Sequence, residues 1–349
     1  MMTFRTPSLI LRSSSSSTPL PYNSSRMNRS KCSSASPHNG NGSSSSSMGD
    51  DSFLRSVLTN MEQVYLNRNP TAKAILELVR STNVDRICYD HLAYRTFGVN
   101  NQGIESIAQL FLDCGYTQMD ELRFPQKKLK AHWFSPPKNV NPDGGSGVYG
   151  PLPRVFISEL LVDQLSQQSQ EIIHNYTGLS GCGHKHSALA SAIGCLTWPK
   201  PSHAEFQMLA RESEYAAWTL VNGYTLNHVT ISTHRLKPPL NNIDNLNRFI
   251  QENGFKLNTE GGVLKVSPDG LLLQSSTVAD SREFEFSDGF KDSQVPASYI
   301  EFAQRLVLPQ FKDLPEEEVD EVHRRDGFEV GNADKIFEST SNIQLSKSA

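Results

Sequence analysis

Long hydrophobic runs are missing from this sequence, and acidic residues are missing from its first 49 positions. No stretch reaches the roughly 18 apolar residues that a membrane-spanning helix needs, which excludes an integral membrane protein. The formal net charge is -4, and five positive charges lie in residues 1–49, which leaves -9 for the rest of the chain. A mildly acidic body lacks the basic surface that nucleic-acid binding needs. We therefore expect neither nucleic acid nor a membrane as a partner.

Cysteine is scarce, and the motifs of several large enzyme classes are absent. Of the five cysteines, Cys32 lies in the first 50 residues, and the other four form no Cys-x-x-Cys pair. Four thiols in about 300 residues do not make a disulfide framework, so a reducing compartment is the simpler expectation. The sequence has no Gly-x-Ser-x-Gly elbow and no Walker loop, which leaves hydrolase and NTPase functions without support.

Residues 1–50 have the composition of a targeting segment. They contain 17 serines, five basic residues and only one acidic residue, Asp50. This composition is typical of an organellar transit peptide, which is disordered and excluded from the fold. No long amphipathic helix with arginines can be drawn here, so we expect a plastid rather than a mitochondrion. The alternative is a disordered tail without a targeting role.

The rest of the chain shows an internal repeat. Residues 87–165 and 223–310 both have the pattern strand, helix, and three further strands. A helical region, 51–86, precedes the first module, and a largely helical insert, 166–222, separates the two. A polar C-terminal segment follows at 311–340. We expect 51–340 to be a single catalytic domain and 341–349 a disordered tail.

The repeat predicts an α+β fold in which two βαβββ modules pair into one cupped mixed sheet with added helices. The first strand of each module carries a histidine and the last a glutamate, as His91 with Glu159 and His228 with Glu301. The concave face of such a sheet would hold a ligand.

Two histidines and a carboxylate from separate strands suit a non-haem Fe(II) site. Such a triad occupies one face of an octahedron and leaves positions for substrate and dioxygen. The candidate metal ligands are His91, His228 and Glu301. The alternative for each is a polar residue on a half-buried strand, hydrogen-bonded and otherwise inert.

Two arginines stand four residues from candidate ligands. Arg95 follows His91 within one strand, so both side chains point the same way, about 13 Å apart along the strand. This separation suits a metal at one end and an anchored carboxylate at the other. Arg305 stands in the same relation to Glu301, and its alternative is a surface arginine on an exposed sheet face. The predicted substrate-binding residues are His91, Arg95, His228 and Arg305, with Arg95 also given a catalytic role.

Two other motifs carry less weight. Residues 145–150 match Gly-x-Gly-x-x-Gly, but no strand precedes them and no helix follows, so a dinucleotide site is not expected. Cys182, His184 and His186 with Cys195 fit no common zinc spacing. We expect Cys182 and Cys195 to pack as small apolar groups.

Four ordered motifs resemble a known family: Asp90-His91-Leu92-Ala93-Tyr94-Arg95-Thr96-Phe97, Leu226-Asn227-His228-Val229-Thr230, Tyr299-Ile300-Glu301-Phe302, and the tail elements Arg325-Asp326-Gly327-Phe328-Glu329 and Asn332-Ala333-Asp334-Lys335-Ile336-Phe337-Glu338. The chain resembles the 2-oxoadipate dioxygenase/decarboxylases, also called hydroxyglutarate synthases, and in particular their plant plastid branch. The resemblance runs from about residue 55 to 340. The family is similar in fold to the vicinal-oxygen-chelate enzymes.

The resemblance implies an Fe(II) enzyme that converts 2-oxoadipate and dioxygen to 2-hydroxyglutarate and carbon dioxide in lysine catabolism. It implies that His91, His228 and Glu301 bind the metal and that Arg95 binds the substrate, while Glu159 matches no family ligand. The expected partners are a 2-oxo diacid and dioxygen, and the oligomeric state stays open. Longer bacterial members carry an insertion that this chain lacks, so substrate contacts from that region cannot be assigned. We also expect residues 325–338 to close over the cup as a lid that excludes water.

Two other functions stay open at this point. The same triad could serve another non-haem iron dioxygenase, such as an extradiol enzyme that cleaves a catechol, although a catechol pocket has less use for Arg95. Alternatively, the chain could be a non-catalytic plastid interaction protein. The three intact ligand candidates argue against this second alternative, because a scaffold has no need of them.

Overall fold

The computed structural model describes residues 45–83, 86–99, 101–137, 145–180 and 185–346. The predicted transit peptide lies outside the described residues up to position 44, and so do residues 181–184 around Cys182. Among the described residues no helix has the length and apolar character needed to cross a membrane.

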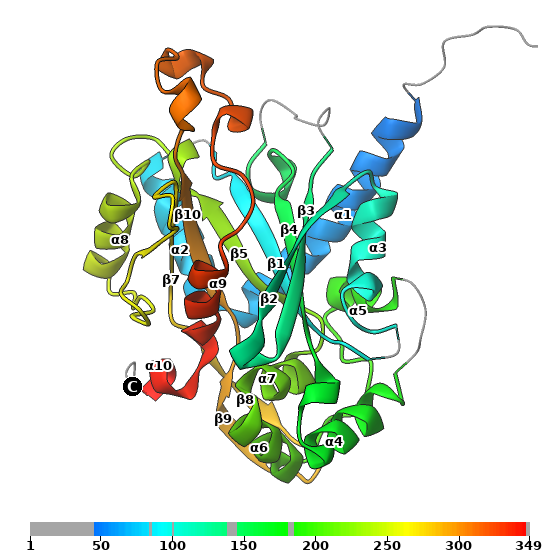
Figure 1. Ribbon diagram of the computed structural model, residues 1–349. Helices are drawn as coiled ribbons and strands as arrows, with labels where there is room; N and C mark the ends of the chain where they lie inside the picture. Colours follow the sequence, from blue (N-terminus) through cyan, green and yellow to red (C-terminus); the bar gives the residue numbers. More distant parts are fainter. Residues whose placement is uncertain (1–44, 84–85, 100, 138–144, 181–184, 347–349) are drawn as a thin grey trace, which may run out of the picture. The chain divides into compact units, whose positions relative to one another are not determined.

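A mixed sheet of eight strands forms the centre of the fold (Figure 1), in the order β2-β3-β4-β1-β5-β10-β7-β6. The strands are β1 Tyr89–Phe97, β2 Thr117–Phe124, β3 Leu129–Ser135, β4 Arg154–Leu160, β5 Leu226–Ser232, β6 Lys265–Val266, β7 Leu272–Ser276 and β10 Tyr299–Arg305. In each half the first and last strands pair in parallel, β1 with β4 and β5 with β10. The strands β1 and β5 pair antiparallel in the middle. The predicted α+β fold of two paired βαβββ modules is confirmed.

One helix follows the first strand of each module, and a glycine ends both. After α3 Glu105–Asp113 comes Gly115 with a φ of +86°, and after α8 Ile243–Glu252 comes Gly254 with a φ of +88°. A residue with a Cβ atom is strained at these angles, so glycine lets the chain leave the helix and return to the sheet. Asn242 caps the start of α8, because its side chain accepts two backbone N–H hydrogen bonds.

The remaining helices cover the sheet and its lower end. Helix α1 Ser45–Arg68 packs on β5, and α2 Pro70–Asn83 packs on β10. The helical spacing of the α1 residues Leu54, Leu58 and Met61 puts all three in the core, each no more than 1% exposed. The insert between the modules consists of α4 Gln167–Thr177, α5 His186–Ile193, α6 His203–Glu212 and α7 Glu214–Asn222.

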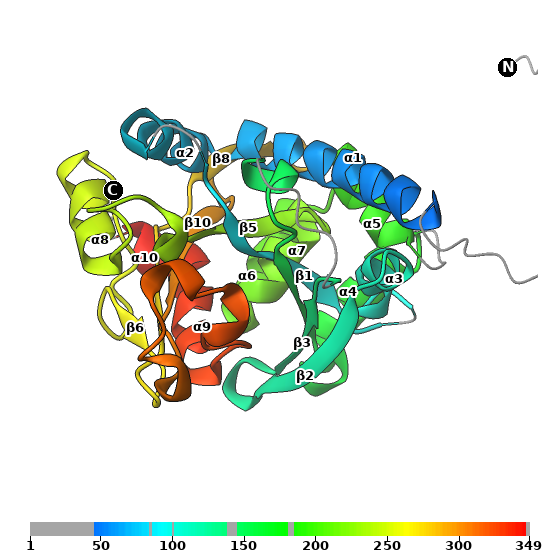
Figure 2. The same ribbon diagram turned by 90° about the horizontal axis from the view of Figure 1, so that it is seen from above.

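The C-terminal segment lies inside the cup. After short 3₁₀ turns comes α9 Val330–Ile336, followed by the 3₁₀ turn η8 Phe337–Thr340. Helix α9 contacts β2 at one end of the sheet and β6 and β7 at the other. Figure 2 shows α9 between these two arms, on the opposite side of the sheet from α1 and α2. Residues near the end of the chain therefore face the centre of the sheet.

Three elements differ from the expectation. A hairpin of β8 Ser281–Glu285 and β9 Lys291–Pro296 forms a separate two-stranded sheet, which the sequence did not reveal because its residues are mostly polar and exposed. Helix α1 begins inside the segment expected to be disordered. The expected disordered tail contains α10 Asn342–Ser346, because Gln344 is buried and the backbone N–H of Asn342 donates to Glu214.

Candidate metal centre

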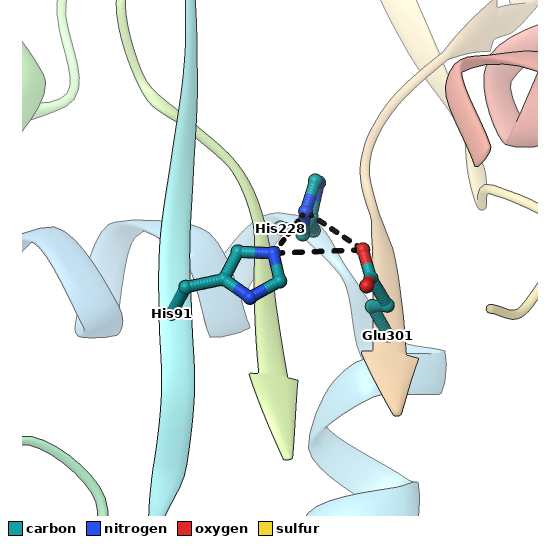
Figure 3. A group of neighbouring side chains, drawn as sticks. All are labelled: His91, His228 and Glu301. Carbon is teal, nitrogen blue, oxygen red and sulfur yellow. Dashed lines mark hydrogen bonds and ion pairs between the residues drawn. The ribbon is translucent and has the colours of Figure 1, made fainter. Parts of the chain in front are cut away.

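Three neighbouring strands bring the predicted ligands together (Figure 3). In the register of the sheet His91 of β1 stands opposite Thr230 of β5, and Thr230 stands opposite Glu301 of β10. Directly opposed residues share a face, and so do residues two apart in one strand. His228 is two residues before Thr230, so the two histidines and the glutamate all point into the cup.

The ligand atoms of the three side chains converge. The Nε2 atoms of His91 and His228 are 3.4 Å apart, and Oε2 of Glu301 lies 3.1 Å from His228 Nε2 and 3.7 Å from His91 Nε2. All three residues are buried, at 2%, 5% and 1% exposure. They are a group whose atoms could hold one metal ion.

Hydrogen bonds on the far side of each ring fix which nitrogen faces the centre. His91 Nδ1 donates to Oδ1 of Asp90 at 2.8 Å, and His228 Nδ1 donates to Oδ1 of Asn227 at 2.9 Å. A proton on Nδ1 leaves the Nε2 lone pair free. The Nε2 atoms of both rings and Oε2 of Glu301 therefore face one another, and Thr230 Oγ1 lies 3.0 Å from His91 Nε2.

Charge and burial set the ionisation of the group. Burial lowers the pKa of His228 to about 4. Burial raises the pKa of Glu301, but the charge on His91 and hydrogen bonds from both histidines outweigh it and lower that pKa to about 2. Burial lowers the pKa of His91, but the carboxylates of Glu301 and Asp90 outweigh it, so this pKa is raised. At neutral pH Glu301 is a carboxylate and His228 a neutral imidazole, the forms that bind a metal.

The donor set fits a divalent transition metal with open positions. Imidazole nitrogen and carboxylate oxygen on one side of an ion are the ligands of non-haem Fe(II) sites, whereas structural zinc sites favour four closed ligands, often thiolates. Gln274 Nε2 donates to Oε1 of Glu301 at 2.7 Å, which leaves Oε2 directed at the histidines. The residues present therefore fit a divalent metal ion.

An apolar wall closes the centre on the side of α9. A cavity of about 20 Å³ adjoins the three ligands, enough for about one water molecule. The Phe328 ring packs edge-on against His91 with the ring centroids 4.8 Å apart, and Phe328 also contacts Phe156 of β4. Phe337 and Ile336 complete this side of the cavity. The wall limits the access of water to the ligands.

Arg95 lies deeper in the same face, next to the C-terminal turn. It is 2% exposed, and its Nη1 donates to Thr340 Oγ1 at 3.0 Å and its Nη2 to the Phe337 carbonyl at 3.3 Å. Its guanidinium carbon lies 5.1, 5.0 and 5.7 Å from the ring centroids of Tyr215, Trp218 and Phe337. Arg95 Nε is buried and has no hydrogen-bond partner among the described residues. The Nε edge of this cation is therefore available to an anion.

A cleft of about 190 Å³ reaches Arg95 from the surface. Lys127 and Lys128 lie on it together with Phe337, which also lines the cavity at the ligands. Phe337 therefore lines both the cleft at Arg95 and the cavity at the ligands.

Arg305 is not the surface arginine considered as an alternative, because its exposure is 0%. Its Nε and Nη2 donate to the two carboxylate oxygens of Asp90 at 2.6 and 2.9 Å. Its Nη1 donates to the carbonyl oxygens of Arg325 and Gly327. These bonds use four of its five N–H donors, and Arg305 is not among the residues that line the cavity at the ligands.

Glu159 and Glu301, which the sequence pattern paired, do not lie at equivalent positions of the two modules. His91 stands opposite Arg154 as His228 stands opposite Tyr299, so the counterpart of Glu301 in β4 is Phe156. Glu159 faces the outer side of the sheet, where its Oε2 accepts the Ile104 N–H at the start of α3. For this reason Glu159 is not one of the candidate metal ligands.

The two weaker motifs carry no chemistry in the described residues. The Gly-x-Gly-x-x-Gly segment forms the 3₁₀ turn η2 Gly147–Tyr149, whose Val148 and Gly150 carbonyls accept bonds from Arg55 Nη1. Cys182 and His184 lie outside the described residues, and Cys195 is exposed rather than packed as expected.

Sequence reasoning missed the residues behind the ligands. Asp90 and Asn227 each precede a ligand histidine, and this repeated dipeptide pattern was a readable signal. Gln274 donates to Glu301, and Asn332 in turn donates to Gln274. No local pattern in the sequence predicts these contacts, because they depend on how α9 packs inside the cup.

Comparison with known proteins agrees with this geometry. A family model described as "HGLS: 2-oxoadipate dioxygenase/decarboxylase" matches residues 57–320. The Oryza sativa subsp. japonica protein named "2-oxoadipate dioxygenase/decarboxylase, chloroplastic/amyloplastic" is 68% identical over 301 residues, which cover 86% of this chain and 82% of that protein. The crystal structure of the hydroxyglutarate synthase from Oryza sativa in complex with 2-oxoadipate has a TM-score of 0.84 and 65% identity, covering 90% of this chain and 100% of that one.

A more distant structure shows the fold alone. A glyoxalase superfamily protein from Ralstonia eutropha has a TM-score of 0.59 and 20% identity, covering 79% of this chain and 85% of its own. The glyoxalase-type, vicinal-oxygen-chelate-like fold that the resemblance implied is thereby confirmed. From the family match over most of its length and the 68% identical relative, the chain belongs to the 2-oxoadipate dioxygenase/decarboxylase family.

Proposed function

We propose that this chain is an Fe(II)-dependent 2-oxoadipate dioxygenase/decarboxylase, which converts 2-oxoadipate and dioxygen to 2-hydroxyglutarate and carbon dioxide in lysine catabolism. The observation that carries the proposal is the buried convergence of His91, His228 and Glu301 on the same sheet face as Arg95. The relative from Oryza sativa named for this reaction supports it.

Ferrous iron held by the three ligands would supply the site where the 2-oxo acid and dioxygen meet and the electrons that activate dioxygen. The protein's part is to orient the substrate. The buried Nε–H of Arg95, with the neighbouring Nη2, offers a carboxylate an edge of two parallel donors. With the distal carboxylate fixed there, the 2-oxo end of the diacid is directed to the metal, and positioning selects the carbon that is hydroxylated.

The segment 311–340 acts as a lid in this proposal. The contacts of Phe328 with His91 and of Phe337 with Arg95 support it, because these two rings of the segment pack directly on a proposed ligand and on the proposed substrate anchor. Excluding water strengthens the ionic contact at Arg95 and protects the oxygen chemistry. Truncation after Pro315 should abolish turnover, and a truncated chain with intact turnover would refute the lid.

A plastid location is part of the same proposal. The relative from Oryza sativa is named chloroplastic/amyloplastic, and residues 1–50 of this chain have a serine-rich composition with a single acidic residue. Fluorescent fusions of the full chain and of a chain that begins at Asp51 test it. Plastid import of the first and cytosolic retention of the second are expected, and equal distribution of the two contradicts the targeting role.

Anaerobic reconstitution with Fe(II), followed by oxygen uptake with a panel of 2-oxo acids and a catechol, tests the activity. We expect uptake with 2-oxoadipate and one carbon dioxide released for each dioxygen consumed. Uptake that ignores 2-oxoadipate, or that responds to the catechol instead, would overturn the proposed reaction.

A further inference from the structure

One chain of hydrogen bonds links the C-terminal segment to His91. The backbone carbonyls of Arg325 and Gly327 accept from Nη1 of Arg305 at 3.1 and 2.7 Å. Nε and Nη2 of the same guanidinium donate to the two carboxylate oxygens of Asp90. Oδ1 of Asp90 also accepts from His91 Nδ1 at 2.8 Å. The side chains of Arg305 and Asp90 are fully buried, so water cannot replace either partner.

A local irregularity in the sheet makes this first chain possible. The pairing of β1 with β5 shifts register between Tyr89 and His91. A bulge re-aims a side chain, so the consecutive residues Asp90 and His91 can join one network. Arg154 adds a second cation 3.6 Å from Asp90, which further holds this carboxylate in its charged form.

A second chain links the same segment to Glu301. Asn332 of α9 is 2% exposed, and its Nδ2 donates to Oε1 of Gln274 at 3.0 Å. The Nε2 of Gln274 then donates to Oε1 of Glu301 at 2.7 Å. Fixing Oε1 in this way leaves Oε2 as the oxygen nearest to both histidines.

His228 has no such link among the described residues. Its Nδ1 is held by Asn227 of its own strand, and its ring stacks on Tyr299 with the centroids 4.7 Å apart. Two of the three ligands are therefore tied to the C-terminal segment, and the third is tied to the sheet alone.

We propose that residues 325–337 belong structurally to the metal centre and orient two of its ligands, His91 through the Arg305–Asp90 pair and Glu301 through the Asn332–Gln274 pair. Arg305 and Asn332 are positioning residues, because neither contacts the metal itself. The inference rests on the proposed function in one respect only, that the three ligands hold a divalent metal. Partners behind metal ligands typically change metal affinity by about 10- to 100-fold when they are removed.

Titration of the metal-free full chain with Co(II), followed by visible absorption, measures this affinity without turnover. We expect Arg305→Lys and Asn332→Ala to bind Co(II) about 10- to 100-fold more weakly than the unchanged chain. The matched controls are Arg55→Lys and Asn222→Ala. Arg55 also pairs with an aspartate and two carbonyl oxygens. The Asn222 amide donates to two backbone carbonyls, as the Asn332 amide does to those of Lys265 and Leu272, and both controls act away from the cup.

A double-mutant cycle separates positioning from general loosening of the fold. If Asn332 acts through Gln274, then Asn332→Ala should weaken Co(II) binding in the native background and change nothing further in Gln274→Ala. Additive losses in the double variant would overturn the relay. Should Arg305→Lys fail to fold, the cycle at Asn332 decides for the segment as a whole.

The remaining outcomes are distinct. Unchanged affinity in Arg305→Lys and Asn332→Ala, or equal losses in the two controls, contradicts the positioning role while the proposed metal centre stands. An unchanged chain that binds no Co(II) contradicts the metal centre itself and the inference with it.

Discussion

The two βαβββ modules share one plan but contribute differently to the site. Both have a parallel pair of first and last strands and a helix closed by glycine, at Gly115 and Gly254. The second module supplies two of the proposed metal ligands, His228 and Glu301, whereas the first supplies only His91. Where β10 has Glu301, β4 has Phe156, which packs against the C-terminal segment. Equivalent positions of the repeat thus carry a candidate metal ligand in one module and a packing side chain in the other.

The largest effect should come from removing the ligand that only the second module has. Glu301→Ala leaves two imidazoles without a counter-charge, and we expect metal affinity to fall by more than about 100-fold, beyond the range for outer partners. Metal content after dialysis and oxygen uptake measure the loss. Glu159→Gln is the control from the other module and should keep its metal. Loss of metal in this variant would show that Glu159 takes part in metal binding.

Arg95 extends the contribution of the first module from the metal to the substrate. Arg95→Ala should cost about 2–5 kcal/mol of transition-state binding, since a buried carboxylate is left unpaired. This equals a loss of roughly 30- to 4000-fold in kcat/KM for the diacid. Metal content should stay at the level of the unchanged chain. Full diacid turnover in this variant would show that the anchor lies elsewhere.

Phe156 holds the position in the first module that Glu301 holds in the second. Its substitution tests whether this position acts by packing alone. Phe156→Ala removes a buried ring from contact with Phe328 and should lower the free energy of unfolding by about 3–5 kcal/mol. Denaturant unfolding measures the change. The purified variant should still take up one metal per chain, and a variant that is stable but metal-free would give Phe156 a different role.

Glu321 joins both modules to the C-terminal segment and should give the smallest effect. Burial raises its pKa, but hydrogen bonding from His234 and the charges of Arg235 and Arg154 outweigh burial and hold the pKa well below its usual range. The stabilisation is therefore present above about pH 4.5 and is lost as the pH falls below it. With 27% of this side chain exposed, Glu321→Gln should cost about 1 kcal/mol at pH 7 and nothing in strong acid. A cost that does not change with pH would contradict this ionic role.

Much of the fold was legible in the sequence because it follows local rules. Strand alternation and the glycines at 115 and 254 gave both modules, and the histidines and glutamate of the metal site lie on their first and last strands. The β8–β9 hairpin stayed hidden since its polar exposed residues have no apolar alternation. The tail helix α10 also stayed hidden, because Asn342 and Gln344 order it only by packing on distant parts of the chain.

The three candidate ligands of the metal site could be predicted from the sequence, but the residues that hold them in place could not. Spacing along the chain suggested Glu159 as the partner of Glu301, and only the strand register shows that Phe156 holds that position. Arg305 was expected to bind substrate or lie on the surface, whereas the fold buries it against Asp90. Arg305 and Asp90 are 215 positions apart in the chain, so no local pattern contains this pairing.

The central claim is that one metal ligand comes from the first module and two from the second. Diffraction from crystals of the Fe(II)-loaded protein tests it most directly, with data recorded on both sides of the iron absorption edge. We expect a single anomalous peak within bonding distance of His91 Nε2, His228 Nε2 and Glu301 Oε2. A peak that excludes any of these three atoms, or that lies beside Glu159, would contradict it.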